Sequence, residues 1–533
     1  MQKSNEKKAL VLSAIAVITL IAVVVGATYA YFQAQGGGSS DIDVNANTAT
    51  TDNLSFQIGG SINLTANQED FGSGMPNKSG STTASATLTA NNATNNATRN
   101  YYVYLDITSN NFEYTTDDEQ AELLLKITDP DGTEVITLGS LERKTSGGVT
   151  GFDITTSTGL ITIADNYEIT STGTVTQEWQ IEVTFANLDS DQNANTGKTF
   201  SANLIIQEEK ILTSIADVCP DGGNLADCAV LLNTTSKDSK YTGLYHHDAD
   251  LANGAQDNSY RYSGANPNNF VCFGPGAEIE GTCANDNLYR IIGLFDDDKD
   301  GNYQIKLIKS DYTTSAMLGT DGRDYKGVYS FGTSNYKGSM ETSAIATYRW
   351  NNDTSANRYG SNNWATSEFN TINLNTNYWN YLGTTWQNLI AEATWHLGGM
   401  EDDEYTAKAF YDGERNNAGY GSNPTTYTDE IGLMYPSDFG YAASPDAWTT
   451  DLISYDSSTI PANNWMYMGL AEWTINPYSS YSNFVFLVND SGNLSSYIAG
   501  LGLSARPVFY LESNVQLEGG SGTITNPIRL SVN

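Results

Sequence analysis

Residues 473–497 read WTINPYSSYSNFVFLVNDSGNLSSY, and the chain continues with GLSARPVFY at 502–510. The apolar runs Phe484–Val488 and Val508–Leu511 are short, rich in β-branched and aromatic residues, and bounded by turn residues, which predicts two buried strands. Asn, Ser, Tyr and Gly dominate the stretches beside them. Tyrosine offers contact area at a low cost in rotamer entropy, and the small polar residues adapt their hydrogen bonds. We predict binding loops on a rigid sheet, with an ordinary polar loop as the alternative.

Composition and length set the class of protein. A chain of 533 residues is too long for one core, so two or three domains are expected. Many Thr, Asn, Ser, Gly and Tyr residues and few amphipathic helical patterns predict a mainly β protein with some α. The formal net charge of −36 makes nucleic acid and anionic lipid poor partners outside the N-terminal segment.

The four cysteines fall into two close pairs, Cys219 with Cys228 and Cys272 with Cys283. Three pairings are possible, and the local one closes two loops of about ten residues, each worth ~2–3 kcal/mol in the chain-entropy model. A zinc site is the alternative, but neither pair has the two-residue spacing of zinc knuckles and no His pair follows at the usual distance. Two disulfides of an exported protein are favoured.

The N-terminus predicts export. Three lysines within the first eight residues precede an uninterrupted apolar run at 9–30. The run reaches the roughly 20 residues that span a bilayer, so it is either cleaved or kept as an anchor with the following chain outside. Residues 26–32, GATYAYF, resemble the signal peptides of the SipW-type signal peptidase of Gram-positive bacteria. We assign 1–35 to a signal peptide or membrane anchor and 36–47 to a flexible linker.

Short strand-like runs alternate with polar turns between residues 48 and 208. Their regular spacing predicts a β-sandwich or jelly-roll domain. Asp129-Pro-Asp-Gly132 is a turn in which proline presets φ and glycine tolerates a positive φ. The clearest strands are Leu54–Ile58, Tyr101–Thr108, Leu123–Thr128, Trp179–Phe185 and Phe200–Gln207.

This first region also resembles a known family. Thr48-Ala-Thr50 follows the signal, a Tyr-Val-Tyr-Leu-Asp strand lies at 102–106, and NLDSDQNANTGKTF at 187–200 precedes the last strand. With the signal segment, these features resemble the TasA/camelysin family of secreted matrix and fibre proteins. The resemblance implies a jelly roll and assembly by donation of an N-terminal strand to the next subunit. The appended C-terminal region departs from the short single-domain members.

Residues 209–243 are expected to connect this domain to a second one at 244–533. There, Leu288–Phe295 and Tyr303–Lys309 predict a hairpin, because both runs alternate and an Asp-Gly turn joins them. The turn also matches the first half of an EF-hand calcium loop at Asp296, Asp298 and Asp300. Its twelfth position is a leucine inside the second strand instead of glutamate, so a solvated acidic turn is favoured over Ca²⁺. No other cofactor is predicted.

The second region contains a Trp-x-x-Ser-x-Phe-Asn segment at 364–370, Leu-Met-Tyr-Pro-Ser-Asp at 433–438, and Arg506-Pro507 before the terminal strand. Apolar residues at 369, 372 and 374 predict a helix that begins at residue 366 or 367. These pieces resemble bacterial surface domains with a C-type-lectin-like fold, akin to formylglycine-generating-enzyme-like domains. In members diversified by retroelements, the variable residues lie at the C-terminal end, where 476–500 stands here.

The resemblance implies an α+β lectin-like head that binds ligand through exposed loops. We expect Arg506 to pair inside the core, and the tryptophans to be core residues. The predicted core tryptophans are Trp350, Trp364, Trp386, Trp395, Trp465 and Trp473. The predicted ligand contacts are Tyr478, Tyr481, Asn483, Asn489, Asn493, Ser495 and Tyr497.

The sequence favours a binding protein over an enzyme. Its three histidines form no recognisable catalytic arrangement, and disulfides explain the cysteines better than nucleophilic chemistry does. We therefore predict a cell-surface adhesin or binding protein of a Gram-positive-type bacterium, with a surface protein or glycan as ligand. A structural biofilm-matrix or fibre protein that self-assembles is the alternative. Retention at the membrane would use residues 9–30 if they remain uncleaved.

Overall fold

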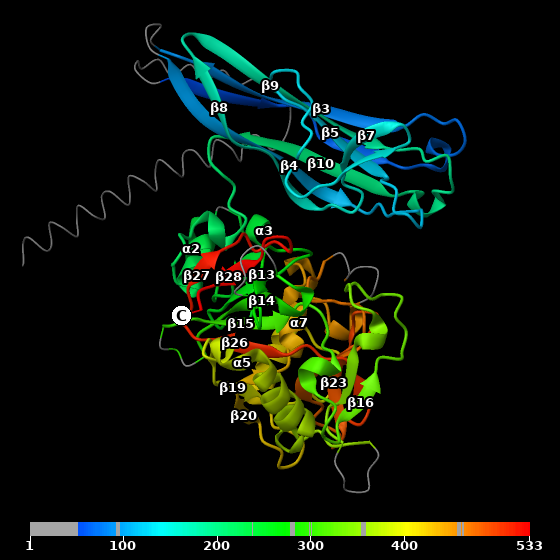
Figure 1. Cartoon of the computed structure of the whole chain (residues 1–533), viewed down its shortest axis with the longest axis vertical. Helices are drawn as coiled ribbons and strands as arrows, with labels where there is room; N and C mark the ends of the chain where they lie inside the picture. Colours follow the sequence, from blue (N-terminus) through cyan, green and yellow to red (C-terminus); the bar gives the residue numbers. More distant parts are fainter. Residues whose placement is uncertain are drawn as a thin grey trace, which may run out of the picture. The chain divides into compact units, whose positions relative to one another are not determined.

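The computed structural model describes residues 52–91, 96–236, 238–277, 283–297, 299, 301–352, 359–455, 460 and 463–532. The predicted signal or anchor and its linker lie outside these ranges, as do Asp298 and Asp300. Within the described ranges, no helix is both long and apolar enough to cross a membrane. Strands dominate the described chain, as the composition predicts (Figure 1).

Residues 53–207 form two sheets. One has the strand order β1-β3-β9-β5-β7-β6 and the other β2-β10-β4-β8. Each of the five predicted strands falls within one of these, although β4 and β9 begin earlier than predicted. The bounds are β1 (Asn53–Ile58), β2 (Ile62–Thr65), β3 (Lys78–Thr89), β4 (Ala97–Asn110), β5 (Leu123–Thr128), β6 (Arg143–Ser146), β7 (Val149–Asp153), β8 (Gly159–Ser171), β9 (Thr174–Phe185) and β10 (Thr199–Gln207), with short 3₁₀ turns η1 (Gln68–Asp70) and η2 (Asn193–Asn195).

Alternation along these strands places one face in the core. In β10 every second residue is buried, as a period of two requires. The Trp179 indole on β9 donates to the Tyr101 hydroxyl on β4 at 3.0 Å, which joins the two sheets through the core. The predicted turn after β5 is present: the Gly132 amide donates to the Asp129 carbonyl at 3.0 Å, and Gly132 has φ 78°.

Residues 244–530 build a second group of sheets around a larger one with the order β18-β26-β15-β14-β13-β28-β27. The predicted hairpin forms the centre of this sheet as β14 and β15, and the predicted terminal strand is β26. β28 pairs in parallel with β13, so the end of the chain closes on the beginning of this region. The bounds are β11 (Leu244–His246), β12 (Tyr260–Tyr262), β13 (Phe270–Cys272), β14 (Leu288–Phe295), β15 (Gln304–Lys309), β18 (Ile390–Ala391), β21 (Ile431–Gly432), β26 (Val508–Leu511), β27 (Leu517–Gly519) and β28 (Ile528–Leu530).

Three smaller sheets accompany it, with the orders β16-β17-β25, β19-β20 and β22-β23-β24. Their strands are β16 (Tyr325–Val328), β17 (Ala346–Arg349), β19 (Ala393–His396), β20 (Thr426–Asp429), β22 (Glu472–Pro477), β23 (Phe484–Val488), β24 (Leu494–Ile498) and β25 (Gly502–Leu503). The α-helices are α2 (Leu225–Thr235), α3 (Ser239–Thr242), α4 (Ser315–Leu318), α5 (Trp379–Gln387), α6 (Ala407–Asn416) and α7 (Pro436–Ala442). The 3₁₀ turns are η3 (Ile215–Asp217), η4 (Asn285–Asn287), η5 (Thr342–Ala344), η6 (Trp364–Thr366), η8 (Pro445–Ala447) and η9 (Leu452–Ser454).

The helix predicted after Trp364 is present but has a different pitch. It is a π-helix, η7 (Phe369–Tyr378), which continues into α5. A π turn places residues five apart on one face, so Phe369 and Leu374 are both fully buried while Ile372 is half-buried. Side chains hold the wide turn, because the Asn375 amide donates to the Ile431 carbonyl at 2.9 Å.

Core predictions from the sequence are confirmed. All six named tryptophans are buried. Arg506 donates to both carboxylate oxygens of Glu472, at 2.8 and 2.5 Å, inside the core. Two local disulfides join the cysteines as the favoured pairing predicts, Cys219 to Cys228 and Cys272 to Cys283, so these thiols are not zinc ligands.

Candidate functional site

The sequence stretch predicted to bind forms a three-stranded antiparallel ribbon, β22-β23-β24. Its register pairs Val485 with Tyr497 and Leu487 with Ser495. Directly paired residues point to the same face, and neighbours along a strand point to opposite faces. Ser495 and Tyr497 therefore share one face with Leu487 and Val485, whereas Tyr478 packs against Phe486, whose side chain points to the other face.

One face of the ribbon borders a groove of about 220 Å³, here called the Tyr497 groove. Tyr497 and Phe331 expose 50% and 47% of their surface, and the leucines that line the same groove are buried or half-buried. The segment that follows β16 (Figure 1) supplies Tyr329 and Phe331 to the lining. The groove is lined by Tyr329, Phe331, Ala471, Leu487, Asn489, Asp490, Ser495, Tyr497, Leu501 and Leu503.

This part of the lining is fixed by contacts of Tyr329. Its hydroxyl accepts a hydrogen bond from the Ala471 amide at 3.1 Å, and its ring lies 5.7 Å from that of Phe331 in an edge-on arrangement. Burial raises the pKa of Tyr329, and the nearby charge of Asp490 adds to this shift. The phenol is therefore neutral at physiological pH and serves as a hydrogen-bonded support.

The β23–β24 turn contributes Asn489 and Asp490 to the groove lining. The Asn489 side-chain oxygen accepts from the Ser491 amide at 2.8 Å, and the Asn489 amide donates to the Asn493 carbonyl at 3.0 Å. Gly492, with φ 89°, supplies the left-handed residue that this turn needs. The Asp490 carbonyl accepts from the Asn335 side chain at 2.8 Å and from the Tyr467 hydroxyl at 2.6 Å. The turn is thus stabilised both by its own hydrogen bonds and by those from Asn335 and Tyr467.

Asn489 and Asn493 therefore stabilise the β23–β24 turn, in addition to any contact with a ligand. The Asn489 Oδ1 atom accepts a hydrogen bond within the turn, and the residue also lines the groove. Asn493 contributes its main-chain carbonyl to the same turn. Ser495 lines the groove from β24.

Tyr478 and Tyr481 lie away from the groove, in a second aromatic cluster. Their rings stack with centroids 5.8 Å apart, and Tyr478 packs 5.4 Å from the buried Phe486 ring. Tyr481 is 57% exposed. Asn483 is half-buried, and its carbonyl accepts from the Ala499 amide at 2.8 Å.

Asn362 is a positioning residue that the sequence analysis missed. This buried side chain places Nδ2 at 2.9 Å from the Tyr478 carbonyl and 2.7 Å from the Tyr481 carbonyl. Its own main-chain amide donates to the Ser482 carbonyl at 2.8 Å, and its side-chain oxygen accepts from Asn423 at 2.8 Å. One asparagine thereby clamps the loop between β22 and β23. Asn362 lies 116 residues before Tyr478, so no local sequence pattern could predict this contact.

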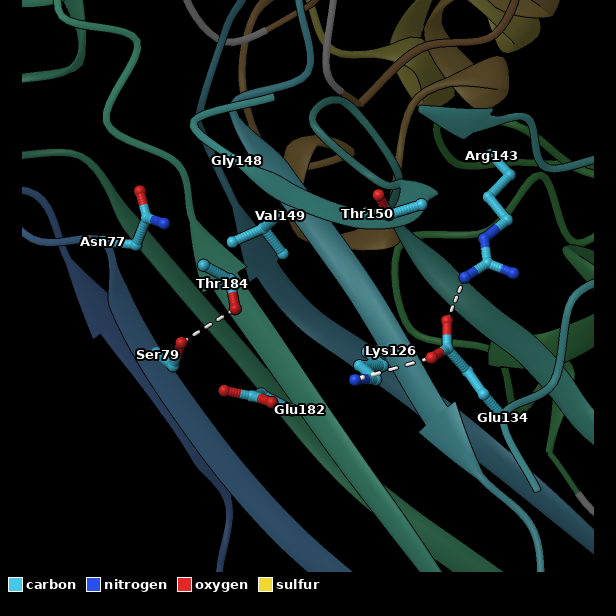
Figure 2. Close-up of a pocket in the computed structure, with 10 residues that line it drawn as sticks. All are labelled: Asn77, Ser79, Lys126, Glu134, Arg143, Gly148, Val149, Thr150, Glu182 and Thr184. Carbon is cyan, nitrogen blue, oxygen red and sulfur yellow. Dashed lines mark hydrogen bonds and ion pairs between the residues drawn. The ribbon is translucent and has the colours of Figure 1, made fainter. Parts of the chain in front are cut away.

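A second, larger hollow of about 420 Å³ lies on the six-stranded sheet. Figure 2 shows its polar lining across β3, β9, β5, β7 and β6. Glu134 pairs with Lys126 at 3.5 Å and also with Arg143, and the Ser79 hydroxyl lies 2.8 Å from that of Thr184. Both cations already have an anionic partner and are therefore less available to bind a ligand. The Tyr497 groove is for this reason the stronger candidate site.

Among the described residues, no group of three His, Cys, Asp or Glu side chains could hold a metal ion. Asp296, the first residue of the calcium-like turn, accepts from the Gly301 amide at 3.2 Å through Oδ2. It therefore caps the hairpin turn. The other two predicted calcium ligands lie outside the described residues.

Comparison with known proteins identifies no relative. No family model, no curated protein and no solved structure matches the chain. Function is accordingly inferred from the chemistry of the groove and of the ribbon that carries it.

Proposed function

We propose that this chain is an exported cell-surface binding protein that takes its ligand in the Tyr497 groove. The observation that carries the proposal is a single groove lined by two half-exposed aromatic rings, Tyr497 and Phe331, together with apolar leucine side chains. Concave apolar surfaces with a few polar groups at the rim are the usual form of a ligand site. Here Asn489 and Ser495 supply an amide and a hydroxyl at that rim.

Rigidity of the ribbon supports the proposal. Asn335 and Tyr467 hold the turn at Asp490, and Asn362 clamps the loop before β23. A preorganised surface loses less conformational entropy when it binds, so more of the contact energy appears as affinity. The ribbon is thus built to present side chains in fixed positions.

The setting of the proposal is the outside of a Gram-positive-type cell. Two disulfides are typical of proteins in an oxidising compartment, and the basic, apolar N-terminus has the pattern of an export signal or anchor. We propose a jelly-roll stalk that carries a lectin-like head, and a ribbon at 476–500 that is open to diversification. The ligand would be a glycan or a protein of another surface.

The test is capture of ligands by the purified, disulfide-bonded chain on arrays of immobilised glycans and peptides. Tyr497→Ala and Phe331→Ala should each weaken the strongest signals at least about tenfold, as loss of a central aromatic contact does. Ile524→Ala removes an exposed apolar side chain outside the groove and should change nothing.

Tyr481→Ala separates the two faces of the ribbon. Loss of binding in Tyr481→Ala alone would move the ligand to the second aromatic cluster and refute the groove. Signals that are insensitive to all three aromatic variants, together with filaments visible by electron microscopy, would favour the matrix-protein alternative.

A further inference from the structure

We infer that the ligand of the Tyr497 groove carries a cationic side chain, so that the partner is a protein segment presenting lysine or arginine. This inference rests on the proposed function and names the chemistry of its ligand. It starts from Asp490, the acidic residue among those that line the groove.

The Asp490 carboxylate is positioned but not neutralised. The residue lies in the β23–β24 turn, whose carbonyl at this position is held by Asn335 and Tyr467. A Cβ atom on Gly332 would lie 3.5 Å from the Asp490 Oδ2 atom, so the carboxylate faces the β16 side of the groove. Within the described part of the chain, no Lys, Arg or His forms an ion pair with it.

Lysine and arginine are both missing from the groove lining. Lys337, whose Nζ atom lies 5.2 Å from the centre of the Tyr467 ring, is not among the residues that line the groove. With a formal net charge of −36 on the chain, the surrounding field also favours a positive ligand. A carboxylate or phosphate ligand would meet only repulsion from Asp490 here.

The rest of the groove fits the stem of a long cationic side chain. Lysine and arginine carry apolar methylene stems that pack along apolar surface while the charged head stays near water. Leu487, Leu501 and Leu503 provide that surface, and the exposed rings of Phe331 and Tyr497 can pack against the stem or accept a cation over their faces. A volume of about 220 Å³ suits one such side chain rather than a folded domain.

The hollow on the six-stranded sheet provides an internal contrast. There the lining itself contains two cations, Lys126 and Arg143, and both pair with Glu134. Asp490 has no comparable partner among the described residues. An aromatic groove lined by a carboxylate and by no described cation favours a positively charged ligand over an anionic one.

The experiment uses two fluorescein-labelled nine-residue glycine–serine peptides, one with a central arginine and one with citrulline, its neutral isostere. Fluorescence anisotropy titrations with the full chain should give at least about tenfold tighter binding to the arginine peptide, a difference of about 1.4 kcal/mol. The preference should shrink at high salt, because ions screen an exposed charge pair.

Asp490→Asn should bring the two affinities to within about twofold of each other. Its matched control is Glu518→Gln, which removes one exposed negative charge outside the groove and should keep the preference. No described hydrogen bond uses the Asp490 carboxylate, so the variant should melt at the wild-type temperature and report on binding alone.

Two results separate this inference from the function on which it rests. Equal affinity of the wild-type chain for both peptides, or a preference that survives Asp490→Asn, overturns the cationic ligand. If array ligands then still depend on Tyr497, the groove remains a binding site for a neutral ligand such as a sugar. If they do not, the proposed function falls as well.

Discussion

Replacing Arg506 with methionine should destabilise the C-terminal region by about 3–5 kcal/mol, the usual effect of removing one partner of a buried ion pair. Arg506 and Glu472 have side chains that are each only 1% exposed. Arg506 donates to both carboxylate oxygens and, at 2.7 Å, to the Met466 carbonyl. Methionine would leave a carboxylate and a carbonyl without these donors in the core.

The variant should also become sensitive to pH. Burial raises the pKa of Glu472 above its ordinary 4.5, and the charge of Arg506 opposes that shift. Without Arg506 the folded pKa rises further, so the folded state favours the protonated acid. Stability is then greatest below pH 4.5 and falls as pH rises towards the folded pKa, with a slope of up to ~1.4 kcal/mol per pH unit.

Guanidinium unfolding followed by tryptophan fluorescence at pH 5 and pH 8 measures both effects, because Trp465 and Trp473 are buried nearby in sequence. The double variant Arg506→Met/Glu472→Leu removes both charges and should recover most of the loss. A single variant that loses under about 1 kcal/mol, as surface pairs do, would refute this reasoning. So would a double variant as unstable as the single one.

Three further predictions concern other parts of the same region. Asn362→Ala should raise the hydrogen-exchange rate of residues 478–484 and lower stability by about 1–2 kcal/mol, because the partly buried carbonyls of Tyr478 and Tyr481 lose their donor; unchanged exchange would show that the clamp is dispensable. Serine at both Cys272 and Cys283 should cost about 3 kcal/mol in thermal or denaturant unfolding, and equal unfolding midpoints would contradict a stabilising disulfide. Burial lowers the pKa of His247, so stability should be retained above pH 6.5 and fall below it, and His247→Gln should flatten that slope relative to wild type in melting curves.

Strands and core residues could be predicted because their signals are local. Phe484–Val488 is a short apolar run bounded by turn residues, and it is β23 with the predicted bounds. The hairpin at 288–309 follows from alternation and an Asp-Gly turn. Both disulfides join cysteines separated by 9 and 11 residues, so the sequence brings them together without help from the fold.

Features that depend on distant residues could not be predicted. The π-helix at Phe369–Tyr378 carries apolar residues that also fit an α-helix, and its wider turn is held by contacts such as that between Asn375 and the Ile431 carbonyl. Ser495 and Tyr497 share a face through the register of β23 with β24, whereas the loop before β23 places Tyr478 against Phe486 on the other face. Phe331 lines the groove although it lies far from the ribbon in the sequence, so no local pattern predicts that the two come together.

The Asn362 clamp has a consequence for how the binding loop can change. Asn362 contacts main-chain atoms at residues 478, 481 and 482, and main-chain carbonyls are the same whatever side chain a residue carries. Exposed positions such as 480, 481 and 482 can therefore exchange their side chains while the loop keeps its course. The main-chain contacts of Asn362 thus fix the conformation of the loop, whereas the exposed side chains that determine what the loop can bind are free to vary.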